Sequence, residues 1–190
     1  MFAPFAMILI VFSIFMGAFK VYVNHYQDKA AALLATASGQ GDKQKDIYQE
    51  VIKRYPRAEA SWVARSLLGH EALEAKHYSE AIQWYQSLTT TSVTPMLRIS
   101  ALHNLALAYL EQGDWKKSLE TLTQAVNDPE NAMKDYSQLL LARVQEGLGN
   151  KDKAVELYQQ LTESNPIVRE EAKGRLSWLK PPAPETNPKH

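Results

Sequence analysis

The chain has 190 residues, of which 45% are hydrophobic and 22% are charged, so it can bury one ordinary core or one short repeat array. Its 21 basic and 21 acidic residues cancel, which excludes the strongly basic surface that would indicate a nucleic acid as the partner. The chain contains no cysteine, and this excludes disulfides, thiolate zinc sites and cysteine nucleophiles.

The first predicted element is an apolar helix at the start of the chain. Residues 2–19 carry no ionisable side chain, and the apolar character continues past Lys20. A helix of this length, at about 1.5 Å per residue, reaches roughly 30 Å, the thickness of the hydrocarbon core of a bilayer. We therefore expect a transmembrane anchor over residues 1–23, with Lys20 snorkelling and with Tyr22 and Tyr26 at the level of the lipid headgroups.

Two other interpretations of this segment fit less well, and its orientation stays open. A cleaved signal peptide would need a basic start and a small-x-small cleavage site, which the segment lacks. An internal core helix would leave a soluble protein with a large exposed apolar patch. Lys20 and Lys29 follow the span and no basic residue precedes it, so the positive-inside count favours a cytoplasmic domain. A start codon placed too far downstream would hide a basic leader and reverse this count.

From about residue 24 to residue 180, the apolar residues fall at i, i+3, i+4 and i+7, which predicts helices. A pattern within these helices repeats every 36 or 37 residues, which indicates a stack of helical hairpins. The aligned pairs are Tyr48-Gln49, Tyr85-Gln86, Leu122-Thr123 and Tyr158-Gln159, and the small residues Ala32, Gly69, Ala106 and Ala142 recur in the same frame. The sequence therefore predicts an all-α repeat domain.

The third repeat unit gives the clearest helix boundaries. Its first helix is predicted over about residues 97–112, followed by a left-handed turn at Gly113. Asp114 is expected to cap the second helix, and Asp128-Pro129 to end it. The unit therefore forms a helix, a tight turn and a second helix.

The other units vary this arrangement. The fourth unit has its turn at Gly149-Asn150, while the second has Lys76-His77 where the glycine should be, so its turn is less well specified. Residues 167–179 are predicted to form a final helix that caps the last hairpin. The tail over residues 181–190 is rich in proline, and we expect it to be disordered or extended.

These residues resemble the tetratricopeptide repeat, whose 34-residue consensus places Leu-Gly, Tyr, Gly-Asp-Tyr, Ala, Tyr, Ala and Pro at fixed positions. The matching positions are Leu68-Gly69, Tyr78, Ala81 and Tyr85, then Leu105-Ala106, Tyr109, Gly113-Asp114-Trp115 and Ala125, then Leu141-Ala142, Gly149, Ala154, Tyr158 and Pro166. The consensus Trp is absent, and the repeats are two or three residues longer than the consensus. The resemblance implies a short α-solenoid of three to four hairpins plus a capping helix, in which five small residues let the helices approach closely: Gly69, Ala81, Ala106, Ala142 and Ala154.

The resemblance also implies a function in binding other proteins, with no catalysis, no cofactor and no small-molecule substrate. In such repeats the first helices of successive pairs line a groove for a peptide or a partner helix. The groove positions carried over from the family are Ser66, His70, Leu73, Glu74, His103, Leu107, Leu110, Glu111, Tyr136, Leu139, Arg143 and Glu146.

A metal site is the alternative that the residues themselves suggest. His70, Glu74 and His77 are spaced i, i+4 and i+7, so on a continuous helix they would share one side and could bind a metal ion or serve an enzyme. His77 falls at the predicted turn, however, and its side chain is expected to leave that face.

The layout of the whole chain is similar to one bacterial family. An apolar span is followed directly by Tyr22-x-x-x-Tyr26 and then by a short repeat array, as in the ancillary subunits associated with the Sec translocon. This similarity implies a single-pass protein of the bacterial inner membrane, facing the periplasm, that acts as a scaffold in protein export or assembly. A cytoplasm-facing membrane adaptor is the alternative.

Overall fold

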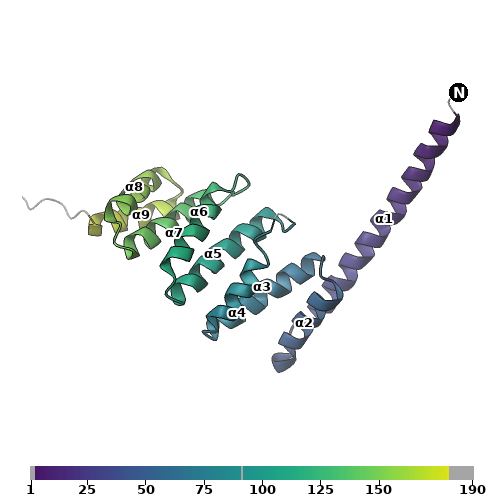
Figure 1. Ribbon diagram of the computed structural model, residues 1–190, viewed down its shortest axis with the longest axis horizontal. Coiled ribbons are helices and arrows are strands. Elements are labelled where there is room, and N and C mark those ends of the chain that lie inside the picture. Colours follow the sequence, from purple (N-terminus) through teal and green to yellow (C-terminus); the bar gives the residue numbers. More distant parts are fainter. Residues whose placement is uncertain (1–2, 91, 180–190) are drawn as a thin grey trace, which may run out of the picture. The chain divides into compact units, whose positions relative to one another are not determined.

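The computed structural model describes residues 3–90 and 92–179, with side chains described from residue 11 onward. Throughout this part of the chain the regular elements are helices, and no strand occurs. The chain divides into two compact units, residues 1–71 and 72–190 (Figure 1), and each is described by itself. The predicted proline-rich tail, residues 181–190, lies outside the described residues.

The first unit is built around one long helix. Its elements are α1 (Ala3–Ala35), η1 (Gly41–Lys43), α2 (Gln44–Arg54) and most of α3 (Glu59–Glu74). The C-terminal part of α1 lies beside α2 (Figure 1). The apolar helix and the first helix of the repeat region are continuous, because no Pro or left-handed residue interrupts α1 after its first turn.

Side chains of α1 hold the start of α3. The Tyr26 ring packs edge-on against the Tyr55 ring, with 5.3 Å between the ring centroids. The Tyr26 hydroxyl accepts a hydrogen bond from the Arg57 amide at 3.4 Å, and Gln27 Oε1 accepts one from the Glu59 amide at 3.0 Å. Tyr26, which was expected at the level of the lipid headgroups, packs in the structure against Tyr55.

The length and apolarity of the described helices bear on the predicted anchor. Over the residues that the structure describes, no helix combines the length and the apolarity that crossing a bilayer requires. The first ten side chains of the predicted anchor, residues 1–23, lie outside that description. The structure therefore gives the transmembrane prediction no support.

The second unit is a stack of antiparallel hairpins. After the end of α3 it contains α4 (Tyr78–Gln86), α5 (Pro95–Glu111), α6 (Trp115–Asn127), α7 (Lys134–Gly147), α8 (Lys151–Gln160), η2 (Leu161–Glu163) and α9 (Pro166–Leu179). Each helix from α4 to α9 packs against the next in the chain (Figure 1). The predicted all-α solenoid is therefore confirmed for these elements, and so is the final capping helix.

Three left-handed residues turn the chain between paired helices. Gly113 has a φ of 86° and Gly149 a φ of 78°, while Lys76 has a φ of 60°. In each turn the following amide bonds to the carbonyl five residues earlier: His77 to Ala72 at 2.8 Å, Asp114 to Tyr109 at 2.8 Å and Asn150 to Gln145 at 2.9 Å. This is the bond that closes a Schellman motif. The turn at Lys76, which the sequence left less well specified, thus has the same geometry as the two glycine turns.

The third unit follows its predicted boundaries closely. Asp114 caps α6 by accepting a hydrogen bond from the Lys117 amide at 3.1 Å. The helix α6 ends at Asn127, and Asp128 is extended with a ψ of 121°, as expected before a proline. The stop at Asp128-Pro129 is therefore confirmed.

A buried ion pair fixes the loop that follows α6. Arg98 of α5 is 5% exposed, and its Nε and Nη2 donate to the two carboxylate oxygens of Asp128 at 2.9 and 3.1 Å. Nη2 also donates to Glu130 Oε2 at 2.9 Å. The hydrogen bonds from Arg98 hold the pKa of the Asp128 carboxyl below its usual value. The pair ties the end of one hairpin to the first helix of the same hairpin.

The small residues that were predicted at helix contacts are buried. Ala81, Ala142 and Ala154 are completely buried, Ala106 is 1% exposed, and Gly69 is buried within α3. The recurring Tyr85 and Tyr158 are also buried, and burial raises the pKa of Tyr85 to about 12. Small side chains at such positions let neighbouring helices approach while the tyrosines fill the space beside them.

The left-handed turns predict opposite effects for two matched substitutions. Lys76→Gly should raise the free energy of unfolding by about 0.5–1 kcal/mol, because glycine adopts a positive φ without steric cost. Gly113→Ala should lower it by about 1 kcal/mol, because alanine adopts a positive φ only with strain. An added Cβ at this position meets no other atom within 4 Å, so this backbone strain is the whole expected effect. Urea unfolding of the full chain checks both changes, and a neutral or destabilising Lys76→Gly would contradict the argument.

Candidate functional site

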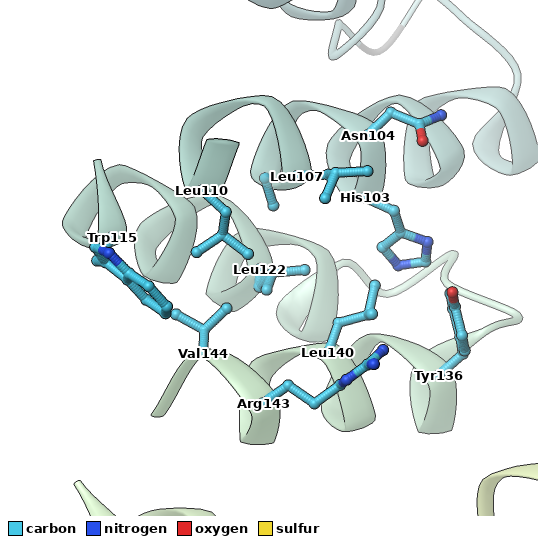
Figure 2. A pocket seen from close by; sticks show the side chains of 11 residues that line it. His103, Asn104, Leu107, Leu110, Trp115, Leu122, Tyr136, Leu140, Arg143 and Val144 are labelled. Carbon is cyan, nitrogen blue, oxygen red and sulfur yellow. The ribbon is translucent and has the colours of Figure 1, made fainter. Parts of the chain in front are cut away.

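A pocket of about 410 Å³ opens between α5 and α7, with α6 beneath it (Figure 2). Its volume lies within the range of about 300–1,000 Å³ that is typical of ligand sites. The residues that line it are His103, Asn104, Ala106, Leu107, Leu110, Trp115, Leu122, Tyr136, Leu140, Arg143 and Val144. All of them belong to the second unit, so the pocket is formed within one compact body.

Two rows of side chains form the walls. On α5 the row contains His103, Leu107 and Leu110, at i, i+4 and i+7. On α7 Tyr136 and Leu140 begin a second row, which Arg143 continues at the same spacing. Residues so spaced share one face of a helix, so the two rows face each other across the pocket.

One end of the pocket is apolar. Leu110 and Val144 surround it, and Trp115 closes it at the far side (Figure 2). The Trp115 ring lies over Gly147, where an added Cβ would come within 2.1 Å of the ring. Because Gly147 has no side chain, the Trp115 ring can occupy this space and form one wall of the pocket.

The other end is polar and contains His103. His103 Nε2 lies 2.7 Å from Ser137 Oγ, and the imidazole packs edge-on against Tyr136 with 5.2 Å between the ring centroids. Ser137 is fully buried and also accepts a hydrogen bond from Asn131 Nδ2 at 2.9 Å. Burial lowers the pKa of His103, so the imidazole is neutral at neutral pH.

The structure brings five of the predicted groove residues together in this pocket: His103, Leu107, Leu110, Tyr136 and Arg143. Three others lie elsewhere. Leu139 is 1% exposed and belongs to the core between α7, α8 and α9. Glu111 accepts a hydrogen bond from the Tyr78 hydroxyl at 3.4 Å, and Glu146 accepts bonds from Tyr158 and Arg175 at 2.9 and 3.3 Å. Leu139 therefore belongs to the core and not to the groove, whereas Glu111 and Glu146 are not among the residues that line this pocket.

The sequence missed several lining residues, and helix periodicity could have found one of them. Leu140 lies four residues after Tyr136 and three before Arg143, so it shares their face, whereas Leu139 is rotated by about 100° toward the core. Asn104 and Trp115 also line the pocket, although neither is among the predicted groove positions. The prediction therefore placed Leu139 in the groove, where the structure has Leu140.

The four groove residues predicted on α3 are not among the residues that line the pocket. Ser66 and His70 lie in the first unit, and Leu73 and Glu74 lie in the second. Leu73 packs against the core cluster that includes Ala72.

The predicted metal set receives no support. In the described ranges no three His, Asp or Glu side chains gather closely enough to bind a metal ion. His77 comes after the end of α3, and its Nδ1 lies 3.9 Å from Glu80 Oε2. The change of direction at the turn removes His77 from the face that His70 and Glu74 would share.

The burial of His103 predicts how stability depends on pH. An unfolded imidazole takes up a proton near pH 6.5, whereas the folded one does so only at lower pH. The unfolded state therefore binds more protons in this window, and the free energy of unfolding falls as the pH falls through it. His103→Gln should make this loss smaller. Urea unfolding between pH 7.5 and 5.0 checks the slope, and identical slopes for the two proteins would contradict the assignment.

Comparison with known proteins identifies part of this architecture. Family models described as tetratricopeptide repeat match residues 101–133 and 136–166. The chain is also 31% identical over 112 residues to tetratricopeptide repeat protein 12 of Mus musculus, an alignment that covers 58% of this chain and 15% of the mouse protein. These two consecutive segments of the second unit are therefore similar to tetratricopeptide repeats, and the pocket lies between their first helices.

Proposed function

We propose that the groove between α5 and α7 binds a polypeptide segment of another protein. The observation that carries this proposal is the exposure of large apolar side chains around a pocket: Leu107 is 42% exposed, Trp115 40% and Tyr136 45%. Apolar side chains gathered around a concave site favour the burial of an apolar partner. Tetratricopeptide repeats indicate a protein-interaction scaffold, and the pocket is where two of them meet.

The chemistry of the pocket favours binding over catalysis. Ser137, which bonds to His103, has no exposed surface, so a substrate cannot reach its hydroxyl. Among the residues that line the pocket, Arg143 alone carries a formal charge at neutral pH, because His103 is neutral. No pair of groups with separated acid and base roles is present in this lining. A non-enzymatic scaffold is thus the function that these groups support best.

We also propose that α1 tethers this scaffold to a membrane. Val11, Phe12, Ile14 and Phe15 are each 59–68% exposed in the first unit, so their apolar surface is uncovered by the chain itself. Lipid would cover it. This proposal goes further than the described residues, among which no helix has the length and apolarity of a membrane span. It places the repeats at the bacterial inner membrane, on the periplasmic side, in protein export or assembly.

Two substitutions test the groove. Leu107→Glu and Tyr136→Ala should each reduce the capture of partners by crosslinking in the native membrane by more than about tenfold, because a charge or a lost aromatic ring in an interface centre costs about 2 kcal/mol or more. Both side chains are more than one-third exposed, so the fold should survive. Mass spectrometry of crosslinked partners measures the loss.

The matched control is Ile167→Glu on α9, where the side chain is 83% exposed and outside the pocket. This variant should capture partners as the unchanged protein does. If Leu107→Glu and Tyr136→Ala leave the set of partners unchanged while circular dichroism reports folded protein, the groove is not the binding site.

Fractionation tests the membrane proposal separately. The full chain should stay in the membrane pellet during carbonate extraction, and Ile14→Asp with Phe15→Asp should release it, because each buried aspartate costs about 3 kcal/mol in a bilayer. Protease added to spheroplasts should degrade the repeats if they face the periplasm. A full chain that is extracted without these substitutions would rule out the tether.

A further inference from the structure

Arg143 is the charged group of the groove, and its present partner is weakly held. Its Nε lies 3.4 Å from Glu171 Oε1 of α9. The two side chains are 46% and 35% exposed, respectively. Ion pairs with this exposure are screened by solvent and contribute little to stability. The guanidinium is therefore available to a second carboxylate at small cost.

The groove separates apolar surface from hydrogen-bond donors. Leu110, Val144 and Trp115 lie toward one end, whereas the guanidinium of Arg143 lies toward His103 and Tyr136 at the other (Figure 2). A ligand that fills both ends needs a large apolar side chain and, a short distance away, a group that accepts hydrogen bonds from a cation.

We propose that the groove binds segments in which an Asp or Glu side chain lies about one helical turn from a large apolar residue, and that Glu171 occupies Arg143 until the partner's carboxylate displaces it. The inference rests on the proposed function and specifies the chemistry of the partner.

The complementarity of charge supports a carboxylate. Arginine presents a planar fork of N–H donors that matches the two oxygens of a carboxylate, and one carboxylate oxygen of Glu171 already lies 3.4 Å from Arg143 Nε. Binding sites for phosphorylated peptides use clusters of arginine, whereas Arg143 is the one arginine that lines this pocket. A carboxylate is therefore favoured over a phosphate.

Selection from a random peptide library provides the probe. Peptides of about 12 residues are selected against the full chain and against two variants, Arg143→Gln and Glu171→Gln. Peptides selected on the unchanged protein should be enriched in Asp or Glu near a large apolar residue, and this enrichment should disappear with Arg143→Gln. Lys153→Gln on the exposed surface of α8 removes the same charge outside the pocket and is the matched control.

Fluorescence polarisation with one selected peptide then measures the interaction between Arg143 and the carboxylate of the peptide. The peptide is amidated at its C-terminus. It is compared with a second peptide in which Asn or Gln replaces the Asp or Glu. Arg143→Gln should weaken binding of the acidic peptide about fivefold and that of the amide peptide less than about twofold. Glu171→Gln should strengthen binding of the acidic peptide alone, because it removes the internal competitor.

A third peptide, with the amide side chain and a free C-terminus, distinguishes the source of the carboxylate. If it restores the dependence on Arg143, the partner supplies a chain terminus, and the assignment to an Asp or Glu side chain is overturned.

Two outcomes separate this inference from the proposed function. If selected peptides bind and Leu107→Glu abolishes their binding, but Arg143→Gln weakens acidic and amide peptides alike, the groove is a peptide site and the carboxylate proposal is wrong. If Leu107→Glu leaves the binding of the selected peptides unchanged, the proposed function itself fails. Thermal unfolding of each variant confirms that the fold is intact.

Discussion

The left-handed residue between paired helices sets the geometry on which the rest of the second unit depends. At Gly113 and Gly149 the chain reverses within one residue, and the bond from the following amide to the carbonyl five residues earlier closes each first helix. The second helix must then return along the first, where small residues such as Ala106 and Ala154 permit close contact. A longer or looser turn would let the two helices slide, and the tyrosines that fill the space beside the small residues would lose their places.

The groove follows from this stacking. When each hairpin packs on the next, the first helices α5 and α7 lie near one another with a shared direction, and residues at i, i+4 and i+7 on each form facing walls. Buried contacts then fix the walls in place. Ser137 holds the His103 ring from below, and Gly147 admits the Trp115 ring at the opposite end. The shape of the site thus depends on positions that a ligand would not touch.

Residues with one dominant local preference could be predicted from the sequence. Gly113, Asp114 and the Asp128-Pro129 pair each favour one backbone role, and the structure places the turn, the cap and the stop at these residues. Lys76 could not be predicted as left-handed, because the closing of its turn overrides the preference of its own backbone. Leu139 and Leu140 are chemically identical, so composition could not assign one to the core and the other to the groove; that distinction needed the register of α7. Repeat spacing likewise could not assign Trp115 to the groove, since the spacing carries no information on the space that Gly147 leaves.

The register of the capping helix α9 determines both which of its residues are buried and where Glu171 lies. Val168 and Ala172 of α9 are buried in the core with Tyr158, and Glu171 lies next to them on the turn that faces Arg143. The register that buries the apolar pair therefore also sets the position of the carboxylate. The two contributions differ in size, because burying an apolar side chain of this kind contributes about 1–3 kcal/mol, whereas an exposed ion pair contributes about 1 kcal/mol or less. A partner that takes Arg143 from Glu171 thus leaves the capping helix held by its apolar contacts, and the end of the solenoid stays closed while the groove is occupied.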